Sequence, residues 1–251
     1  SYETLASKTY LSSNGKTLAY PSLLQLKLER FYTSFRFLNL SLCFFFLSCL
    51  FLVAYKLKAR KFIFLLSLGT FSLGLLSLSL LLALRIYILE RPPVSNMEET
   101  LLFVPFVIAL AALFLSHFMK STDLLFIASL AVFFLLSLAS YKGMDRSLEP
   151  LQPVLNSNYW LTIHVLLVVS SYSLFILSGI AAHCFVIFTG LKKSDKLKNV
   201  FYMAMKNSIL AGTVLLIAGT FLGGVWAAES WGRFWDWDPK ESWAFISICL
   251  Y

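Results

Sequence analysis

The sequence predicts an all-α fold, a polytopic transmembrane helical bundle with six full spans and a truncated seventh. Of its 251 residues, 59% are hydrophobic and 14% are charged, and the mean hydropathy is +0.77. A soluble domain carries about 25% charged residues. Several apolar runs reach the roughly 20 residues that a helix needs to cross a bilayer. The composition therefore excludes an ordinary soluble protein.

The net charge of +8 does not indicate nucleic-acid binding. The basic residues gather between the apolar runs, so they bear on orientation in a membrane. None of the four cysteines forms a Cys-x-x-Cys pair, and the sequence suggests neither a redox motif nor a zinc site.

Residues 1–36 form a polar and basic segment without the pattern of a cleavable signal peptide. Its second half, residues 21–32, is either an amphipathic helix that lies on membrane lipid or a solvated tail. We treat it as separate from the bundle of residues 37–251.

Six apolar runs follow, and local signals set their ends. Arg85 closes the second run, and Pro92 and Pro93 stop its helix. Ser95, with Glu98 three residues on, predicts a capping box at the start of the third, and Asn158 predicts an N-cap for the fifth. Beyond the first turn of the third, which holds Glu98 and Glu99, no Lys, Arg, Asp or Glu lies inside a predicted span, which argues against an ion-coupled transporter. The predicted spans are 37–55, 62–84, 95–119, 124–141, 158–191 and 208–225.

A seventh helix is predicted to begin at Asp238, as the N-cap, with Pro239 at N1 and Glu241 at N3. The run from Trp243 to Tyr251 is too short to span a membrane. Since the chain also begins with a serine, we expect it to be part of a longer protein.

The distribution of Lys and Arg predicts the orientation. More of them follow the first, third and fifth spans than the others, which places those junctions in the cytoplasm. The segment after the sixth span, and residues 1–36, then lie on the outer side. The basic residues of the inner junctions include Lys56, Lys58, Arg60, Lys61, Lys120, Lys192, Lys193, Lys196, Lys198 and Lys206.

Five of the six tryptophans lie between Trp226 and Trp243, interleaved with acids and bases. Indole rings favour the membrane interface because they are apolar but carry an N–H group. The cluster is either a plain membrane anchor or a flat aromatic platform for a large planar ligand.

The stretch Trp231-Gly-Arg-Phe-Trp-Asp-Trp-Asp-Pro-Lys-Glu-Ser-Trp243, with its lead-in 219–226, resembles the tryptophan-rich WWD signature of cytochrome c biogenesis proteins. The match is best to the CcsA/ResC group of system II, sometimes fused as CcsBA, and more distant to CcmC and CcmF. Residues 158–165, Asn-Tyr-Trp-Leu-Thr-Ile-His-Val, resemble the segment of that family that holds an outer-face haem-ligating histidine.

The resemblance implies that the segment 226–243 holds haem b, with His164 as an axial ligand of the iron. From the residues alone, a histidine in a span is also a common helix–helix hydrogen-bond partner, and Trp160 is either a belt residue or a pocket wall. Indole faces can stack on a porphyrin, basic side chains can pair with its propionates, and glycine permits close approach. The predicted contacts are His164, Trp226, Trp231, Gly232, Arg233, Trp235, Trp237, Asp238, Lys240 and Trp243. We interpret His117 and His183 as structural.

The resemblance further implies a component of a cytochrome c synthetase, or haem lyase. Such a component presents haem on the outer face for thioether attachment to the Cys-x-x-Cys-His motif of apocytochrome c. The expected partner is a CcsB/ResB-like subunit or fused domain, and the expected location is a bacterial cytoplasmic or a thylakoid membrane. Two alternatives remain, a CcmC-like haem chaperone or exporter without synthetase activity, and a non-haem membrane scaffold or permease.

Overall fold

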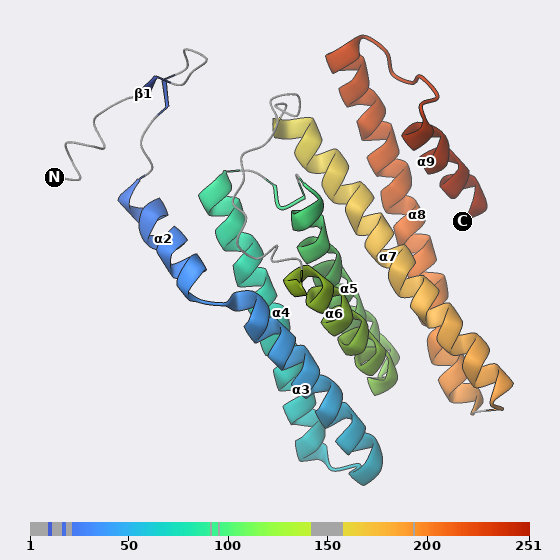
Figure 1. Cartoon of the computed structure of the whole chain (residues 1–251). Coiled ribbons are helices and arrows are strands. Elements are labelled where there is room, and N and C mark those ends of the chain that lie inside the picture. Colours follow the sequence, from blue (N-terminus) through green and yellow to red (C-terminus); the bar gives the residue numbers. More distant parts are fainter. Residues whose placement is uncertain are drawn as a thin grey trace.

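The chain folds as a bundle of long helices, which confirms the predicted all-α membrane architecture (Figure 1). Six helices of the computed structural model are long and apolar enough to cross a membrane. The structure describes residues 22–90, 92–94, 96–141, 158–192 and 194–251, and a pair of two-residue strands at Tyr10–Leu11 and Thr17–Leu18.

The helices follow one another with short connections through most of the chain. The predicted spans correspond to α3 to α8, and the predicted start of a seventh helix corresponds to α9. The helices are α2 (Leu23–Ser34), α3 (Phe37–Lys58), α4 (Lys61–Leu89), α5 (Met97–Met119), α6 (Thr122–Tyr141), α7 (Asn158–Gly190), α8 (Asp195–Trp231) and α9 (Pro239–Leu250).

The two ends of the bundle differ. The α3–α4, α5–α6 and α7–α8 junctions lie together at the lower end in Figure 1, and the connection from α8 to α9 lies at the upper end. Lys56 and Lys58 at the end of α3, Lys61 at the start of α4, and Lys120 after α5 belong to the lower end. We call it the basic end.

Small polar residues link α3 to α4 and α6. Ser48 of α3 donates a hydrogen bond to the Ser67 carbonyl of α4 (3.2 Å), and its hydroxyl lies 3.3 Å from that of Ser129 of α6. Ser77 of α4 donates to the Phe37 carbonyl at 3.0 Å. Such contacts matter in a bilayer, where lipid tails are as apolar as the side chains and burial alone gives little attraction between helices.

The prediction that the spans contain no charged residue is wrong. Helix α4 continues to Leu89, so Arg85 lies inside it, and both Arg85 and Glu99 of α5 are about 1% exposed. The Arg85 guanidinium donates to the Tyr32 hydroxyl (2.8 Å) and to a Glu99 carboxylate oxygen (3.4 Å). Helix α4 continues past Arg85 because arginine is a good helix former and its charge has partners in the bundle.

The start of α5 also differs from the prediction. The N-cap is Asn96, whose side chain accepts the Glu99 N–H at 2.8 Å, so the cap lies one residue later than predicted. Ser95 and the side chain of Asn158, the two predicted caps, lie outside the described residues. The shift places Glu99, rather than Glu98, at N3, facing the buried Arg85.

Helix α8 is longer at both ends than the predicted span 208–225. Lys196 and Lys198 lie in its first turns, and Trp226 and Trp231 lie in its last. Lysine does not interrupt a helix, so the helix continues until Gly232. Its 37 residues measure about 55 Å at 1.5 Å per residue, more than a hydrocarbon core of roughly 30 Å. One end or both must therefore project into the polar region.

Within the amphipathic segment, α2 packs against α4. A capping box of Ser22 and Gln25 starts it, and Gln25 also donates to the Glu90 carboxylate at 2.8 Å. Tyr32 near its end is 4% exposed. Of the two possibilities for this segment, a helix and a solvated tail, residues 23–34 adopt the helix.

We predict that Arg85→Met lowers the free energy of unfolding by about 3–5 kcal/mol, because it removes the guanidinium that balances the charge of the buried Glu99 carboxylate. The double variant Arg85→Met/Glu99→Met should recover much of that loss. Unfolding in detergent, followed by circular dichroism, measures both. Lys198→Met is the control, since its ion pair with Asp195 is exposed and contributes only about 0–1 kcal/mol. Equal stability of Arg85→Met and the wild type would contradict this account.

Candidate functional site

The site rests on the close approach of α7 and α8. Three glycines of α8 face α7 at helical spacing, and an added Cβ at each would clash. It would lie 2.7 Å from Phe175 at Gly212, 2.8 Å from Val168 at Gly219 and 2.6 Å from His164 at Gly223. Small residues at such positions let two membrane helices pack backbone to backbone.

His164 lies in this contact, on α7. Its Nδ1 is 2.6 Å from the carbonyl oxygen of Gly219, and its ring is half-buried. A carbonyl can only accept, so Nδ1 carries the proton and donates. In a neutral imidazole the other nitrogen, Nε2, then has a free lone pair. A backbone carbonyl on the far nitrogen is the usual arrangement for a histidine that binds a metal ion.

A cavity of about 760 Å³ opens beside this imidazole. Its size is in the range of pockets for small molecules and cofactors, about 300–1,000 Å³. Its walls come from α7, α8, the loop between α8 and α9, and the start of α9. The lining residues are His164, Val165, Val168, Tyr172, Leu216, Thr220, Gly223, Gly224, Trp226, Ala227, Trp231, Trp235, Asp238, Pro239, Lys240, Glu241, Trp243 and Ala244.

The indole rings cross one another instead of forming one flat platform. Trp226 and Trp231 meet edge to face, with ring centroids 4.8 Å apart and planes at 66°. Trp235 and Trp237 do the same at 5.7 Å and 85°. The platform expected from the sequence is therefore replaced by separate aromatic walls. Edge-to-face packing, which aromatic quadrupoles favour, explains the difference.

Two helix caps define the loop between α8 and α9. Gly232 ends α8 in the left-handed conformation (φ 74°), and its N–H donates to the Ala228 carbonyl at 3.0 Å. Asp238 begins α9 and accepts the Glu241 N–H at 2.8 Å, which confirms the predicted cap. Between them, Phe234 covers Gly224, where an added Cβ would lie 2.7 Å from its ring. The nonhelical part is thus shorter than predicted, because α8 continues to Trp231, beyond the predicted end of the sixth span at 225.

The charged residues of this loop divide into two groups. Arg233 forms an ion pair with Asp236 and lies 5.9 Å from the Trp231 ring centroid, outside the cavity wall. Glu241 is committed to the cap, because its carboxylate accepts the Asp236 N–H at 2.8 Å. Lys240 lines the cavity and is exposed, so it is the basic side chain available to an anionic ligand there.

Two buried polar atoms of the cavity wall lack a hydrogen-bond partner within the described part of the chain. They are the indole Nε1 of Trp235 and the hydroxyl oxygen of Thr220. Buried polar groups normally have partners, and an orphan in a binding cavity indicates a place where a ligand can supply one. The wall is therefore mostly apolar, with two polar atoms to which a ligand can form hydrogen bonds.

The structure brings most of the predicted contacts together. Among them, Gly232, Arg233 and Trp237 do not line the cavity, and the side chain of Trp160 lies outside the described residues. Sequence reasoning missed Tyr172, Val168 and Thr220, among others. Positions 164, 168 and 172 repeat every four residues and so share one helix face, which is the signal that could have found them. The predicted residues that line the cavity are His164, Trp226, Trp231, Trp235, Asp238, Lys240 and Trp243.

The other two histidines lie away from this cavity. His183 is exposed, and its Nδ1 contacts the Gly179 carbonyl of its own helix at 2.7 Å. His117 is exposed at the basic end of α5. Among the residues that the structure describes, no three His, Cys, Asp or Glu side chains gather into a metal site.

Comparison with known proteins decides the family. Residues 94–251, which include the whole cavity, match the family of cytochrome C assembly proteins. The chain belongs to that family.

Individual proteins are also similar to this chain. Protein NrfI of Wolinella succinogenes is 39% identical over 178 residues, which are 68% of this chain and 19% of NrfI. Cytochrome c biogenesis protein CcsA of Guillardia theta is 28% identical over 223 residues, 77% of this chain and 73% of that protein. CcsA of Prochlorococcus marinus is 29% identical over 195 residues, 63% of this chain and 62% of that protein.

We predict that Asp238→Ala speeds amide hydrogen exchange in residues 239–245 about fivefold, because losing an N-cap costs about 1 kcal/mol. Asp238→Asn should retain slow exchange, since asparagine caps equally well. Asp236→Ala is the matched control, because Asp236 pairs with Arg233 and does not cap α9. Unchanged exchange in Asp238→Ala would show that the cap does not hold the start of α9.

Proposed function

We propose that the cavity between α7, α8 and α9 binds haem b as a substrate, with Nε2 of His164 as one axial ligand of the iron. The observation that carries this proposal is the 2.6 Å contact between His164 Nδ1 and the Gly219 carbonyl. In the neutral ring, a proton on Nδ1 leaves the lone pair of Nε2 free, and His164 lines the cavity. Imidazole is a standard axial ligand of haem iron.

The cavity suits the rest of the molecule. A porphyrin is flat and apolar, and four indoles line the cavity, Trp226, Trp231, Trp235 and Trp243. Propionates are anionic, and Lys240 is the basic side chain of the wall. The Trp235 N–H and the Thr220 hydroxyl, both without partners in the described chain, are further donors for propionate oxygens.

The Gly219 carbonyl also sets the character of the ligand. A hydrogen bond from the second ring nitrogen fixes the orientation of the imidazole and raises the basicity of the nitrogen that binds the metal. Since Gly219 lies on α8 and His164 on α7, the strength of ligation depends on how closely these helices pack. The chain would hold the iron with one ligand from this cavity.

We further propose that the chain is the haem-presenting membrane component of a cytochrome c synthetase. It would hold haem on the outer side of a bacterial cytoplasmic or thylakoid membrane, opposite the basic end, as the positive-inside rule favours. There, thiols of an apocytochrome Cys-x-x-Cys-His motif would add to the haem vinyl groups. A CcsB/ResB-like subunit or fused domain would be the other component of the synthetase. The family match and the names of the CcsA relatives support this role in cytochrome c maturation.

We predict that full-length protein purified from a haem-producing cell shows a Soret band, and that His164→Ala weakens it severalfold. Imidazole added to His164→Ala should restore the band, because it replaces the missing ligand. His183→Ala is the matched control, since this histidine of the same helix also contacts a glycine carbonyl through Nδ1, that of Gly179, but lies outside the cavity. A colourless wild type, or equal bands in both variants, would contradict haem binding at His164.

Co-expression with an apocytochrome c separates the synthetase from a haem chaperone. A synthetase component should yield covalent holocytochrome, detected by haem staining after denaturing electrophoresis, and His164→Ala should reduce the yield. A Soret band without holocytochrome, when the full protein and its partner are present, would favour the chaperone.

We predict that Gly223→Ala displaces the imidazole, because the new methyl group would lie 2.6 Å from His164 Cε1. The Soret band should weaken or shift. Gly179→Ala, on α7 where an added Cβ meets nothing within 4 Å, should leave the spectrum unchanged. A wild-type spectrum in Gly223→Ala would show that the helix contact does not position the ligand.

A further inference from the structure

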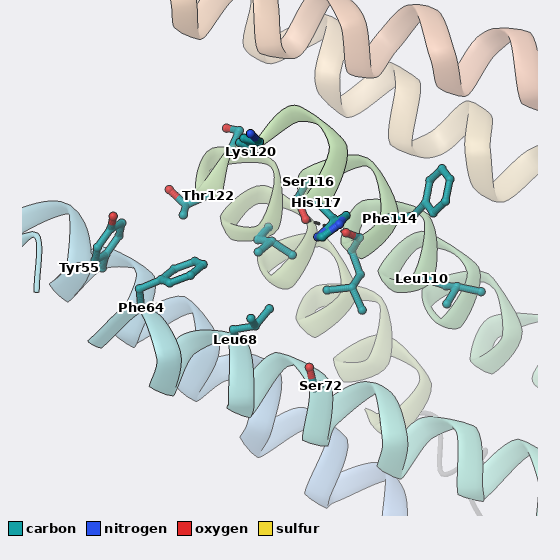
Figure 2. A pocket seen from close by; sticks show the side chains of 13 residues that line it. Tyr55, Phe64, Leu68, Ser72, Leu110, Phe114, Ser116, His117, Lys120 and Thr122 are labelled. Carbon is teal, nitrogen blue, oxygen red and sulfur yellow. Dashed lines mark hydrogen bonds between the residues drawn. The ribbon is translucent and has the colours of Figure 1, made fainter. Parts of the chain in front are cut away.

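A second cavity, of about 830 Å³, lies toward the basic end of the bundle (Figure 2). One wall is formed by α3 and α4, with Tyr55, Phe64, Leu68 and Ser72. The other is formed by α5, the α5–α6 turn and the start of α6. It shares no residue with the haem cavity, and the proposed function does not use it.

The lining is charged at one end and, apart from Ser72, apolar at the other. Lys120 and Thr122 lie at one end, by the turn between α5 and α6, while Ser72 and Leu110 lie toward the other (Figure 2). Leu110 and Lys120 are ten residues apart on α5, so the cavity extends about 15 Å along the helix. That distance is about half of a 30 Å hydrocarbon core, the depth of one leaflet.

The polar end carries unbalanced positive charge. The Asp123 carboxylate is 2.6 Å from the Lys56 ammonium and also accepts a hydrogen bond from Ser121. Lys120 has no ion pair within the described residues, and the His117 ring lies one turn before it. Further basic residues follow α3 at the same end, among them Lys58, Arg60 and Lys61.

We propose that this cavity is a binding site for an anionic membrane phospholipid. The phosphate lies at Lys120 and His117, and one acyl chain lies between α4 and α5 along Leu68 and Leu110. Basic pockets between membrane helices are the usual sites for anionic headgroups. The bound lipid fills the space between the α3–α4 pair and the α5–α6 pair at the basic end.

Native mass spectrometry of the full-length protein, titrated with phosphatidylglycerol or phosphatidylcholine, tests the proposal. The wild type should bind phosphatidylglycerol more tightly, and Lys120→Ala should weaken that binding about fivefold, the effect of one basic residue at an anionic surface. Lys192→Ala is the matched control. Lys192 follows α7 at the same end with the same left-handed backbone (φ 50° against 48°), but does not line the cavity.

The acyl chain is tested separately. Ser72→Trp should fill the apolar end and reduce binding of both lipids, whereas Gly69→Leu, on the same helix outside the cavity, should not. Retention of the Soret band in each variant shows that it has folded.

Three results would overturn the proposal. These are equal affinity for the two lipids, equal losses in Lys120→Ala and Lys192→Ala, and full binding in Ser72→Trp. A bound mass equal to haem that disappears in His117→Ala would assign the cavity to a tetrapyrrole instead.

Discussion

The close packing of α7 on α8 is the constraint on which the site depends. Glycine at positions 212, 219 and 223 removes the side chain at these three points of the contact, so the backbone of α8 meets the side chains of α7 directly there. One consequence is that a helix carbonyl, that of Gly219, is within hydrogen-bond distance of an imidazole on the neighbouring helix. A single steric condition thereby fixes the position of His164, whose ring lines the cavity.

The aromatic loop depends on a second condition, the two caps that hold its ends. Gly232 permits the left-handed turn that ends α8, and Asp238 starts α9 within a few residues, so the chain reverses directly over the cavity. The acids of the signature form the ion pair and the cap of this turn. The tryptophans pack edge to face. Asp236, Asp238 and Glu241 thus hold the loop through their ion pair and caps, while four of its tryptophans, Trp226, Trp231, Trp235 and Trp243, line the cavity.

The sequence predicted what depends on local signals. The six apolar runs, the Asp238 cap and the placing of His164 near the tryptophans follow from run length, capping chemistry and helix rise. The buried Arg85–Glu99 pair could not be predicted, because only packing of α2, α4 and α5 shows that these charges satisfy each other. The full extent of α8 could not be read from run length, because lysines end an apolar run without ending the helix. Tyr172 and Thr220 join the site only through the pairing of two helices.

The most direct measurement is a structure of the full-length protein with haem bound, determined by electron cryomicroscopy. We expect density for the porphyrin between α7, α8 and α9, with iron bonded to Nε2 of His164 and Nδ1 still in contact with the Gly219 carbonyl. Haem in another part of the bundle, iron bonded to Nδ1, or an imidazole turned away from α8 would contradict it.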